Sequence, residues 1–253
     1  MAKQLLGWLG LLALLYAALC ALLFVFQRSF IYMPQPRAPV PGAEMLALNT
    51  EAGDVWVTTL PHAGAKAVVF FGGNADDAGQ NLPSLAQAFP EHAIYLLNYR
   101  GYGGSAGTPS EAALVADALQ LVDQVSAAHA QVTVIGLSLG SGVAVQVAAQ
   151  RPLARLVLVT PFHSVLELAR ERFPFVPVRW LLHDRYESWI HAPQIGVPTT
   201  IIVAANDEVI SRRSTDLLTA AFPPGVAQQV VIDGVGHNDI RLSEHYLPAL
   251  AGR

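Results

Sequence analysis

Val132-Thr133-Val134-Ile135-Gly136-Leu137-Ser138-Leu139-Gly140 gives the strongest indication of how this chain folds. An apolar run leads straight into Ser138, and the small residues Ser141-Gly142-Val143-Ala144 that follow are compatible with a helix. A buried strand that turns sharply at a serine and continues as a helix is a nucleophile elbow, which holds the hydroxyl above the edge of a sheet. Glycines at 136 and 140 let strand and helix approach closely. The stretch therefore predicts that Ser138 is a nucleophile.

The rest of the chain alternates strand-like and helix-like segments. The predicted strands are short apolar runs at 55–60, 67–71, 93–98, 131–135, 156–160, 199–205 and 229–232. Helical patterns cover 82–89, 109–128, the segment from the elbow to about 150, 212–222 and 243–251. Strands such as Thr200-Ile201-Ile202-Val203-Ala204, which lack polar alternation, are expected where helices cover both faces of a parallel sheet. We therefore predict an α/β fold with a mostly parallel, doubly wound sheet.

An apolar segment at the N-terminus is long enough to cross a bilayer as a helix. Residues 5–26 are 22 consecutive uncharged positions, which reach about 33 Å at about 1.5 Å per residue. A cleaved signal peptide is the competing interpretation, but its apolar core is shorter and no good cleavage site follows here. Cys20 raises a lipoprotein as a third alternative, although Ala17-Ala18-Leu19 is a poor match to the sequence before a lipidated cysteine. We interpret residues 1–28 as an uncleaved transmembrane anchor.

Prolines separate this anchor from the remainder of the chain. Four of them lie between residues 34 and 41, and proline cannot continue a helix, so we expect residues 29–43 to form an extended linker. Residues 44–253 have the length of one catalytic domain. Because an uncleaved N-terminal anchor commonly carries its domain across the membrane, we expect a single-pass membrane protein with this domain outside the cytoplasm. Basic residues are nearly balanced on the two sides of the anchor and do not decide the orientation.

Charge and cysteine content narrow the classes of function. Residues 31–253 carry 13 Lys and Arg against 19 Asp and Glu, so the domain has no basic surplus for binding nucleic acid. The one cysteine, Cys20, lies in the anchor, so no disulfide framework is possible and either redox compartment is tolerated. The sequence shows no clustered His, Cys and Asp ligand set for a metal. We therefore expect neither metal nor cofactor.

Two loops downstream of the elbow supply partners for Ser138. A serine hydroxyl needs a general base, and the base needs an orienting acid. After a nucleophile elbow the acid comes first along the chain and the histidine second, each beyond a late strand. Asp207 follows the penultimate predicted strand, with Glu208 beside it as the rival acid, and His237 lies on a glycine-bordered loop after the last one. We predict that Ser138, Asp207 and His237 form a catalytic triad.

Hydrogen-bond donors for an oxyanion are predicted at two backbone positions. One is the N–H of the residue after the nucleophile, Leu139, and the other comes from the loop Phe70-Phe71-Gly72-Gly73-Asn74-Ala75. The glycines in this loop let the backbone approach a substrate closely. Asn74 is the predicted second donor. The alternative is that the loop is a simple Gly-Gly turn between a strand and a helix.

Four further stretches carry a resemblance to a known family. They are Ile31-Tyr32-Met33-Pro34-Gln35, Phe71-Gly72-Gly73-Asn74-Ala75, the Arg-Gly-Tyr-Gly block within residues 98–107, and Thr160-Pro161-Phe162-His163-Ser164. Together with the elbow they resemble the α/β-hydrolase superfamily, in its subgroup of small serine hydrolases with an N-terminal anchor. The resemblance implies an α/β-hydrolase fold with a short helical cap. Its similarity to protein depalmitoylases also implies lipid or acylated-protein substrates.

Two residues in these stretches need separate interpretation. Gly72 stands where the subgroup frequently has histidine, which leaves the oxyanion backbone intact but removes a side chain that shapes the pocket. Arg100 lies in the glycine-rich block, and we expect it to be structural, because its fork of donors can hold carbonyl groups or an acid in place.

The cap is predicted at residues 163–195, which are rich in aromatic and arginine side chains. One hypothesis is that this segment rests on the membrane surface and admits an acyl chain, since basic and aromatic side chains suit the interface. The alternative, which we favour from the sequence, is a helical cap whose aromatic side chains pack inward.

The combined pattern predicts a serine hydrolase that cleaves a carboxylic ester or thioester through an acyl-enzyme at a membrane surface. The expected substrate is a small-molecule, lipid or acylated-protein ester. A serine peptidase acting on short peptides is the nearest alternative. A non-catalytic membrane scaffold that retains the fold is the other, and fold alone does not distinguish them.

Overall fold

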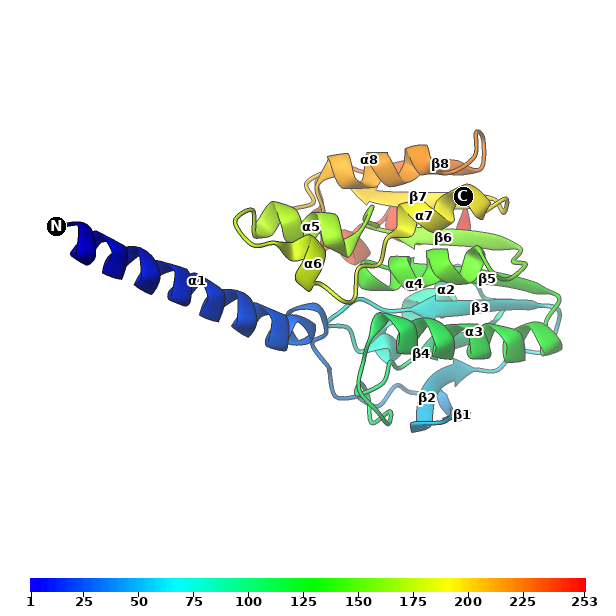
Figure 1. The fold of residues 1–253 in the computed structure, drawn as a ribbon. Helices are drawn as coiled ribbons and strands as arrows, with labels where there is room; N and C mark the ends of the chain where they lie inside the picture. Colours follow the sequence, from blue (N-terminus) through cyan, green and yellow to red (C-terminus); the bar gives the residue numbers. More distant parts are fainter.

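An eight-stranded mixed sheet forms the centre of the domain in the computed structural model, which describes residues 1–253 (Figure 1). Its strands are β1 (Glu44–Thr50), β2 (Gly53–Leu60), β3 (Lys66–Phe71), β4 (Ala93–Leu97), β5 (Gln131–Leu137), β6 (Arg155–Val159), β7 (Thr199–Ala204) and β8 (Ala227–Ile232). They lie in the order β1-β2-β4-β3-β5-β6-β7-β8. All neighbouring pairs from β4 to β8 are parallel, and β2 pairs antiparallel with both β1 and β4. The predicted mostly parallel α/β sheet is therefore confirmed.

Besides the sheet, the chain forms nine α-helices. They are α1 (Ala2–Ile31), α2 (Leu82–Ala88), α3 (Glu111–Ala128), α4 (Leu139–Ala148), α5 (Val165–Arg172), α6 (Val178–Leu181), α7 (Ser188–His191), α8 (Arg212–Ala221) and α9 (Tyr246–Ala251), with short 3-10 helices at Ala78–Asn81, Ala192–Gln194 and Ile240–Leu242. Residues of α3, α4 and α8 share one hydrophobic cluster with the strands, and residues of α2 and α9 share the other. The sheet is thus doubly wound.

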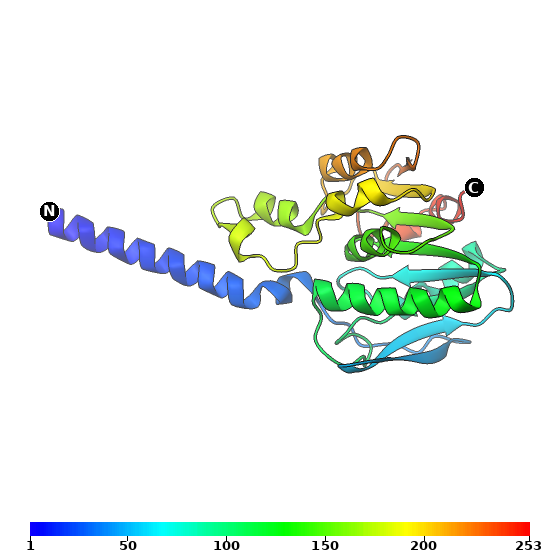
Figure 2. The same cartoon turned by 45° about the vertical axis from the view of Figure 1, so that its right-hand side comes forward.

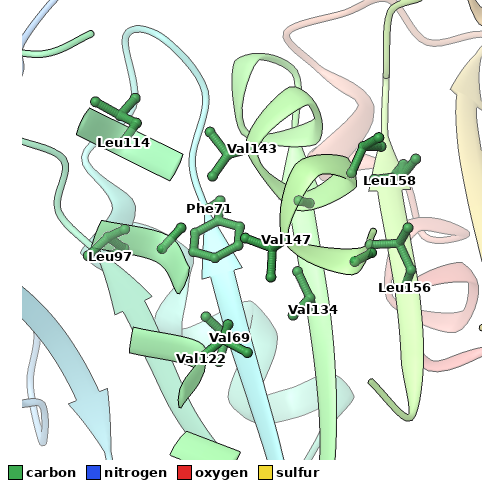
Figure 3. Packing of buried hydrophobic residues seen from close by; sticks show 14 of the residues in the cluster. Val69, Phe71, Leu97, Leu114, Val122, Val134, Val143, Val147, Leu156 and Leu158 are labelled. Carbon is green, nitrogen blue, oxygen red and sulfur yellow. The ribbon is translucent and has the colours of Figure 1, made fainter. Parts of the chain in front are cut away.

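The two hydrophobic cores explain why the central strands show no polar alternation. Successive residues of a strand point to opposite faces of a sheet. In β5, Val134 lies beside Val147 of α4 in the core on one face (Figure 3), while Ile135 belongs to the core on the other face. Both strand residues are fully buried. Because β5 is covered on both faces, its side chains from Val132 to Leu137 are shielded from water, and apolar residues are favoured on both faces of the strand.

The edge strand β1 was not predicted from the sequence. Its residues are mostly exposed or half-buried, and only Leu48 is fully buried. It pairs with one neighbour, β2, and so one of its edges is free. The strand therefore lacks the apolar run that marks the central strands.

The N-terminal helix α1 projects from the domain as a long arm (Figures 1 and 2). It is long and apolar enough to cross a membrane, and none of its most apolar 18-residue window is buried inside the protein. The helix ends at Ile31, three residues beyond the predicted boundary of the anchor at 28. The predicted linker 29–43 begins inside this helix, and its first extended residue, Tyr32, is buried against the domain. The chain after the helix is therefore fixed to the domain at its start.

The cap, residues 163–195, lies between β6 and β7 and contains α5, α6 and α7. Our expectation that its aromatic side chains pack inward is wrong for most of them. The exposed fractions are 87% for Phe175 and 84% for Trp180, and Phe173 and Trp189 are also exposed. Tyr186 is fully buried. The helix α6 spans a single turn, and it buries Val178 and leaves Trp180 exposed.

Candidate active site

The turn at Ser138 has the strained backbone that a nucleophile elbow requires. Ser138 has φ 48° and ψ −113°, between the end of β5 and the first residue of α4. A non-glycine residue at positive φ costs energy and persists only where its surroundings enforce it. A Cβ added to Gly136 would collide with the carbonyl oxygen of Gly140, and one added to Gly140 would collide with that of Phe71. The two glycines are therefore required by the close approach of β3, β5 and α4.

Ser138, His237 and Asp207 form a continuous chain of hydrogen bonds. His237 Nε2 lies 2.9 Å from Ser138 Oγ, and His237 Nδ1 lies 2.8 Å from Asp207 Oδ2 and 3.0 Å from Oδ1. Asp207 follows β7 and His237 follows β8. The side chains of His237 and Asp207 are 9% and 8% exposed, so this contact is largely shielded from water. The structure brings together the three side chains predicted from the sequence.

The two neighbouring acids, Asp207 and Glu208, have different roles in this geometry. Asp207 Oδ1 also accepts hydrogen bonds from the N–H groups of Val209 (2.9 Å) and Ile210 (2.7 Å), which fix its carboxylate toward the histidine ring. Glu208 Oε2 accepts the backbone N–H of His237 at 3.0 Å. This hydrogen bond lowers the pKa of the Glu208 carboxyl. Asp207 therefore orients the imidazole, and Glu208 holds the loop that carries it.

Two backbone N–H groups lie at the positions predicted for an oxyanion hole. Leu139 is the first residue of α4, where the N–H has no partner within the helix. The N–H of Asn74 makes no hydrogen bond within the protein. Between them, Gly73 lies so close to the serine that an added Cβ would be 3.8 Å from Ser138 Cβ. A cavity of about 100 Å³ opens here, lined by Gly73, Asn74, Ala75, Asp76, Leu137, Ser138, His237, Asn238 and Arg241.

The glycine-rich block at 98–107 holds the oxyanion loop in place. Tyr102 donates its hydroxyl to the carbonyl oxygen of Asn74 at 2.6 Å, and Tyr99 donates to that of Gly72 at 2.9 Å. Burial raises the pKa of Tyr102 to about 12, so the hydroxyl keeps its proton. The N–H of Met33, two residues beyond α1, lies 3.0 Å from the same Asn74 oxygen. The segment that follows α1 and the Tyr-rich block thus meet at the predicted oxyanion hole.

Arg100 of this block is structural, as the sequence indicated. Its Nε and Nη2 atoms donate to the two carboxylate oxygens of Asp117 at 2.8 and 2.7 Å. Asp117 lies in α3, and its side chain is 2% exposed. The bidentate pair ties the loop after β4 to the helix α3, away from the serine.

Sequence reasoning missed a polar cluster beside the cavity. Arg241 Nη1 lies 3.2 Å from Asp76 Oδ1 and 2.8 Å from Asn81 Oδ1, and Asn81 donates to Asp76 Oδ2 at 2.8 Å. A Cβ on Gly72 would lie 3.0 Å from Asp76 Oδ2. The Asp76 carboxylate thus occupies the space beside Gly72. The sequence indicates open space at position 72, because glycine has no side chain, but it does not show that Asp76 fills this space.

Searches against known proteins agree with this architecture. A family model described as Alpha/beta hydrolase family matches residues 68–195. An uncharacterized protein of Mycobacterium tuberculosis strain H37Rv is 35% identical over 253 residues, covering 92% of this chain and 88% of that protein. The chain belongs to the alpha/beta hydrolase family. Membership in this family supports hydrolase activity.

More distant relatives agree with this assignment. The alpha/beta hydrolase domain-containing protein aho-3 of Caenorhabditis elegans is 32% identical over 190 residues, which cover 72% of this chain and 55% of that protein. The structure of the Pyrococcus furiosus esterase Pf2001 superposes with a TM-score of 0.67 at 14% identity, covering 87% of this chain and 95% of the esterase. At that identity the likeness concerns the fold alone. The chain therefore has an alpha/beta hydrolase fold.

Proposed function

We propose that this protein is a serine hydrolase that cleaves carboxylic ester or thioester bonds through an acyl-enzyme at a membrane surface. The observation that carries the proposal is the hydrogen-bonded series from Ser138 Oγ through the His237 ring to Asp207, with distances of 2.9 and 2.8 Å. A serine within reach of a histidine that is itself oriented by a buried carboxylate is the arrangement that activates a hydroxyl.

In the proposed reaction His237 Nε2 takes the proton of Ser138 as Oγ attacks the substrate carbonyl carbon. Asp207 accepts a hydrogen bond from Nδ1–H and stabilises the imidazolium that forms. The N–H groups of Leu139 and Asn74 stabilise the negative oxygen of the tetrahedral intermediate. His237 then gives its proton to the leaving alcohol or thiol, which leaves an acyl group on Oγ. Water attacks this acyl group with the same base, and the carboxylic acid is released.

The size of the cavity supports a substrate that is only partly enclosed. The cavity at Ser138 has about 100 Å³, whereas pockets that enclose a whole small molecule have roughly 300–1,000 Å³. We propose that the ester group and its nearest atoms enter the cavity and that the rest of the substrate lies outside it. This suits an acyl chain or an acylated protein better than a small polar metabolite.

A substrate panel tests this proposal. The full-length protein in detergent micelles would be assayed with matched acyl esters, thioesters and peptide amides, alongside the Ser138→Ala and Ser126→Ala variants. Ser126 is an exposed residue of α3 and serves as the matched control. We expect hydrolysis of esters or thioesters by the wild type and the control, and none by Ser138→Ala. Preferential cleavage of amides would favour a peptidase, and a folded but inactive wild type would favour a scaffold.

A further inference from the structure

We infer that the tip of the cap, residues 173–180, inserts into the lipid bilayer beside α1 and places Ser138 next to substrates embedded in the same leaflet. The part that concerns substrates rests on the proposed hydrolase function. The part that concerns the membrane does not.

The tip presents apolar aromatic side chains that the protein leaves wholly or partly uncovered. Phe175 and Trp180 are 87% and 84% exposed, and Phe173 is 38% exposed. Exposed aromatic groups gathered on one short segment mark an interaction surface rather than ordinary surface variation. Aromatic side chains are also enriched where proteins meet the interface of a membrane.

The tip lies against the apolar helix α1, which identifies the bilayer as its partner. The hydroxyl of Tyr16 donates to the carbonyl oxygen of Phe175 at 2.8 Å. Tyr16 lies in the middle of the apolar run 5–26, whose side chains are almost all exposed. A surface that is continuous with an uncovered membrane-spanning helix is in contact with the same lipid.

The base of the cap is fastened to the last turns of α1. Gln27 is buried, donates to the carbonyl oxygen of Leu181 at 3.1 Å and accepts the N–H of His183 at 2.7 Å. The next residue, Arg28, pairs with the buried carboxylate of Asp184 at 2.9 Å. These contacts, together with the one at Tyr16, hold the cap against α1 along about 18 Å of helix, at about 1.5 Å per residue. The orientation of α1 in a membrane therefore sets the depth of the cap.

The length of α1 places the tip near the boundary of the hydrocarbon layer. Its 30 residues reach about 45 Å, which exceeds a hydrocarbon core of about 30 Å by roughly 15 Å. The last ten or so residues of α1 can therefore run beside the cap in the headgroup region. Tyr16 lies about six residues further toward the N-terminus, which places its contact with Phe175 about 9 Å inside the hydrocarbon layer. Arg170, Arg172 and Arg179 are exposed near the tip, where they can reach lipid phosphates.

The active site lies at the same side of the molecule as α1. The parallel strands point their carboxyl ends toward the side from which the helix projects (Figure 2). Met33, just after the helix, contacts the carbonyl oxygen of Asn74, and Asn74 lines the cavity at Ser138. A bilayer that surrounds α1 and the cap tip therefore faces the carboxyl ends of the parallel strands, where Ser138 lies. The substrate class that fits this placement is an ester or thioester whose acyl chain lies in the bilayer.

Depth-dependent quenching tests the membrane contact without reference to catalysis. The full-length protein would carry a fluorescent label at Phe175→Cys, or at Ala127→Cys as a matched control, in a Cys20→Ala background. Ala127 is exposed near the end of α3, close to the amino end of β5 and so at the opposite end of the strands from Ser138. In vesicles of phosphatidylcholine and phosphatidylglycerol, we expect nitroxide-bearing lipids to quench the label at 175 several-fold more than the label at 127. Equal quenching at the two positions would overturn the inference.

Two further measurements test the link to substrates and distinguish the bilayer from a protein partner. The double variant Phe175→Glu, Trp180→Glu would be compared with Leu46→Glu, which changes an exposed residue of the edge strand β1. We expect the ratio of activity on a vesicle-embedded ester to activity on a water-soluble ester to fall by about tenfold in the double variant, and to stay constant in the control. An unchanged ratio would overturn the substrate placement. Quenching at 175 with no hydrolysis of esters or thioesters by the wild type would reject the proposed function and keep the membrane contact. A label at 175 that is shielded in native membranes but open to aqueous iodide in pure lipid vesicles would indicate a protein partner and contradict the inference.

Discussion

At the scale of single residues, the role of each acid beside His237 depends on whether it contacts the imidazole ring or the backbone N–H. The sequence left two adjacent acids, Asp207 and Glu208, as candidates for orienting His237. The structure separates them, since Asp207 contacts the imidazole ring and Glu208 contacts the backbone N–H of the same residue. Spacing along the chain could not separate them, because both follow the same strand.

Exchanging these acids for their amides tests the separation. We expect Asp207→Asn to lower kcat by about 10³- to 10⁴-fold, because an amide at this position disfavours the productive tautomer of His237. Glu208→Gln keeps an acceptor for the backbone N–H, and we expect a loss of less than about tenfold. Steady-state kinetics on one soluble ester checks both variants. Equal losses would mean that the histidine is oriented through both acids.

The space beside Gly72 provides a second test at this scale. Gly72→His would place its Cβ against the Asp76 carboxylate, where the contact is 3.0 Å, and would disturb the Asp76 contacts to Asn81 and Arg241. We expect a destabilisation of about 1–3 kcal/mol. In an Asp76→Ala background the same substitution should cost less, because the colliding group is gone. Denaturant unfolding of the four proteins gives this coupling, and additive effects would contradict the assigned contact.

At the scale of elements, the loop after β3 is held by contacts that come from far along the chain. Its carbonyl groups accept hydrogen bonds from Tyr99, Tyr102 and Met33. The sequence predicted the loop from its glycines and the tyrosines from a family resemblance. It gave no sign that they touch, because that contact joins the ends of β3 and β4 in space.

Removing one hydroxyl tests whether these contacts position the oxyanion hole. We expect Tyr102→Phe to lower kcat by about 2- to 10-fold with little change in KM, because one hydrogen bond to Asn74 is lost while the substrate contacts remain. Tyr95→Phe is the matched control, since its hydroxyl contacts His129 at the opposite edge of the sheet. A rise in KM with kcat unchanged would indicate a role in substrate binding and contradict a positioning role.

At the scale of the whole molecule, the sequence predicted the central sheet and the helices around it with most boundaries within a few residues. Strands such as β5 and β7 are buried on both faces, so their composition alone identifies them. The edge strand β1 was not predicted, and the aromatic side chains of the cap were wrongly predicted to pack inward, for a common physical reason. Both are exposed, and exposed segments are placed by neighbours that their own sequence does not specify.

The N-terminal helix and the domain form one unit at this scale. The sequence suggested a linker between them, but the structure joins them through Gln27, Arg28 and Tyr32. Tyr32 shares a hydrogen bond with the hydroxyl of Tyr186 at 2.9 Å, inside the core. In the proposed membrane arrangement, a helix fixed to its domain in this way also fixes the side of the domain that faces the membrane.

The proposed reaction depends on Ser138 as the nucleophile of a triad. Reaction of the full-length protein with a fluorophosphonate, followed by mass spectrometry of its peptides, identifies the nucleophile. We predict one adduct on Ser138, its loss in Ser138→Ala and its retention in Ser126→Ala. An adduct on another residue, or equal labelling of wild type and Ser138→Ala, would show that Ser138 is not the nucleophile.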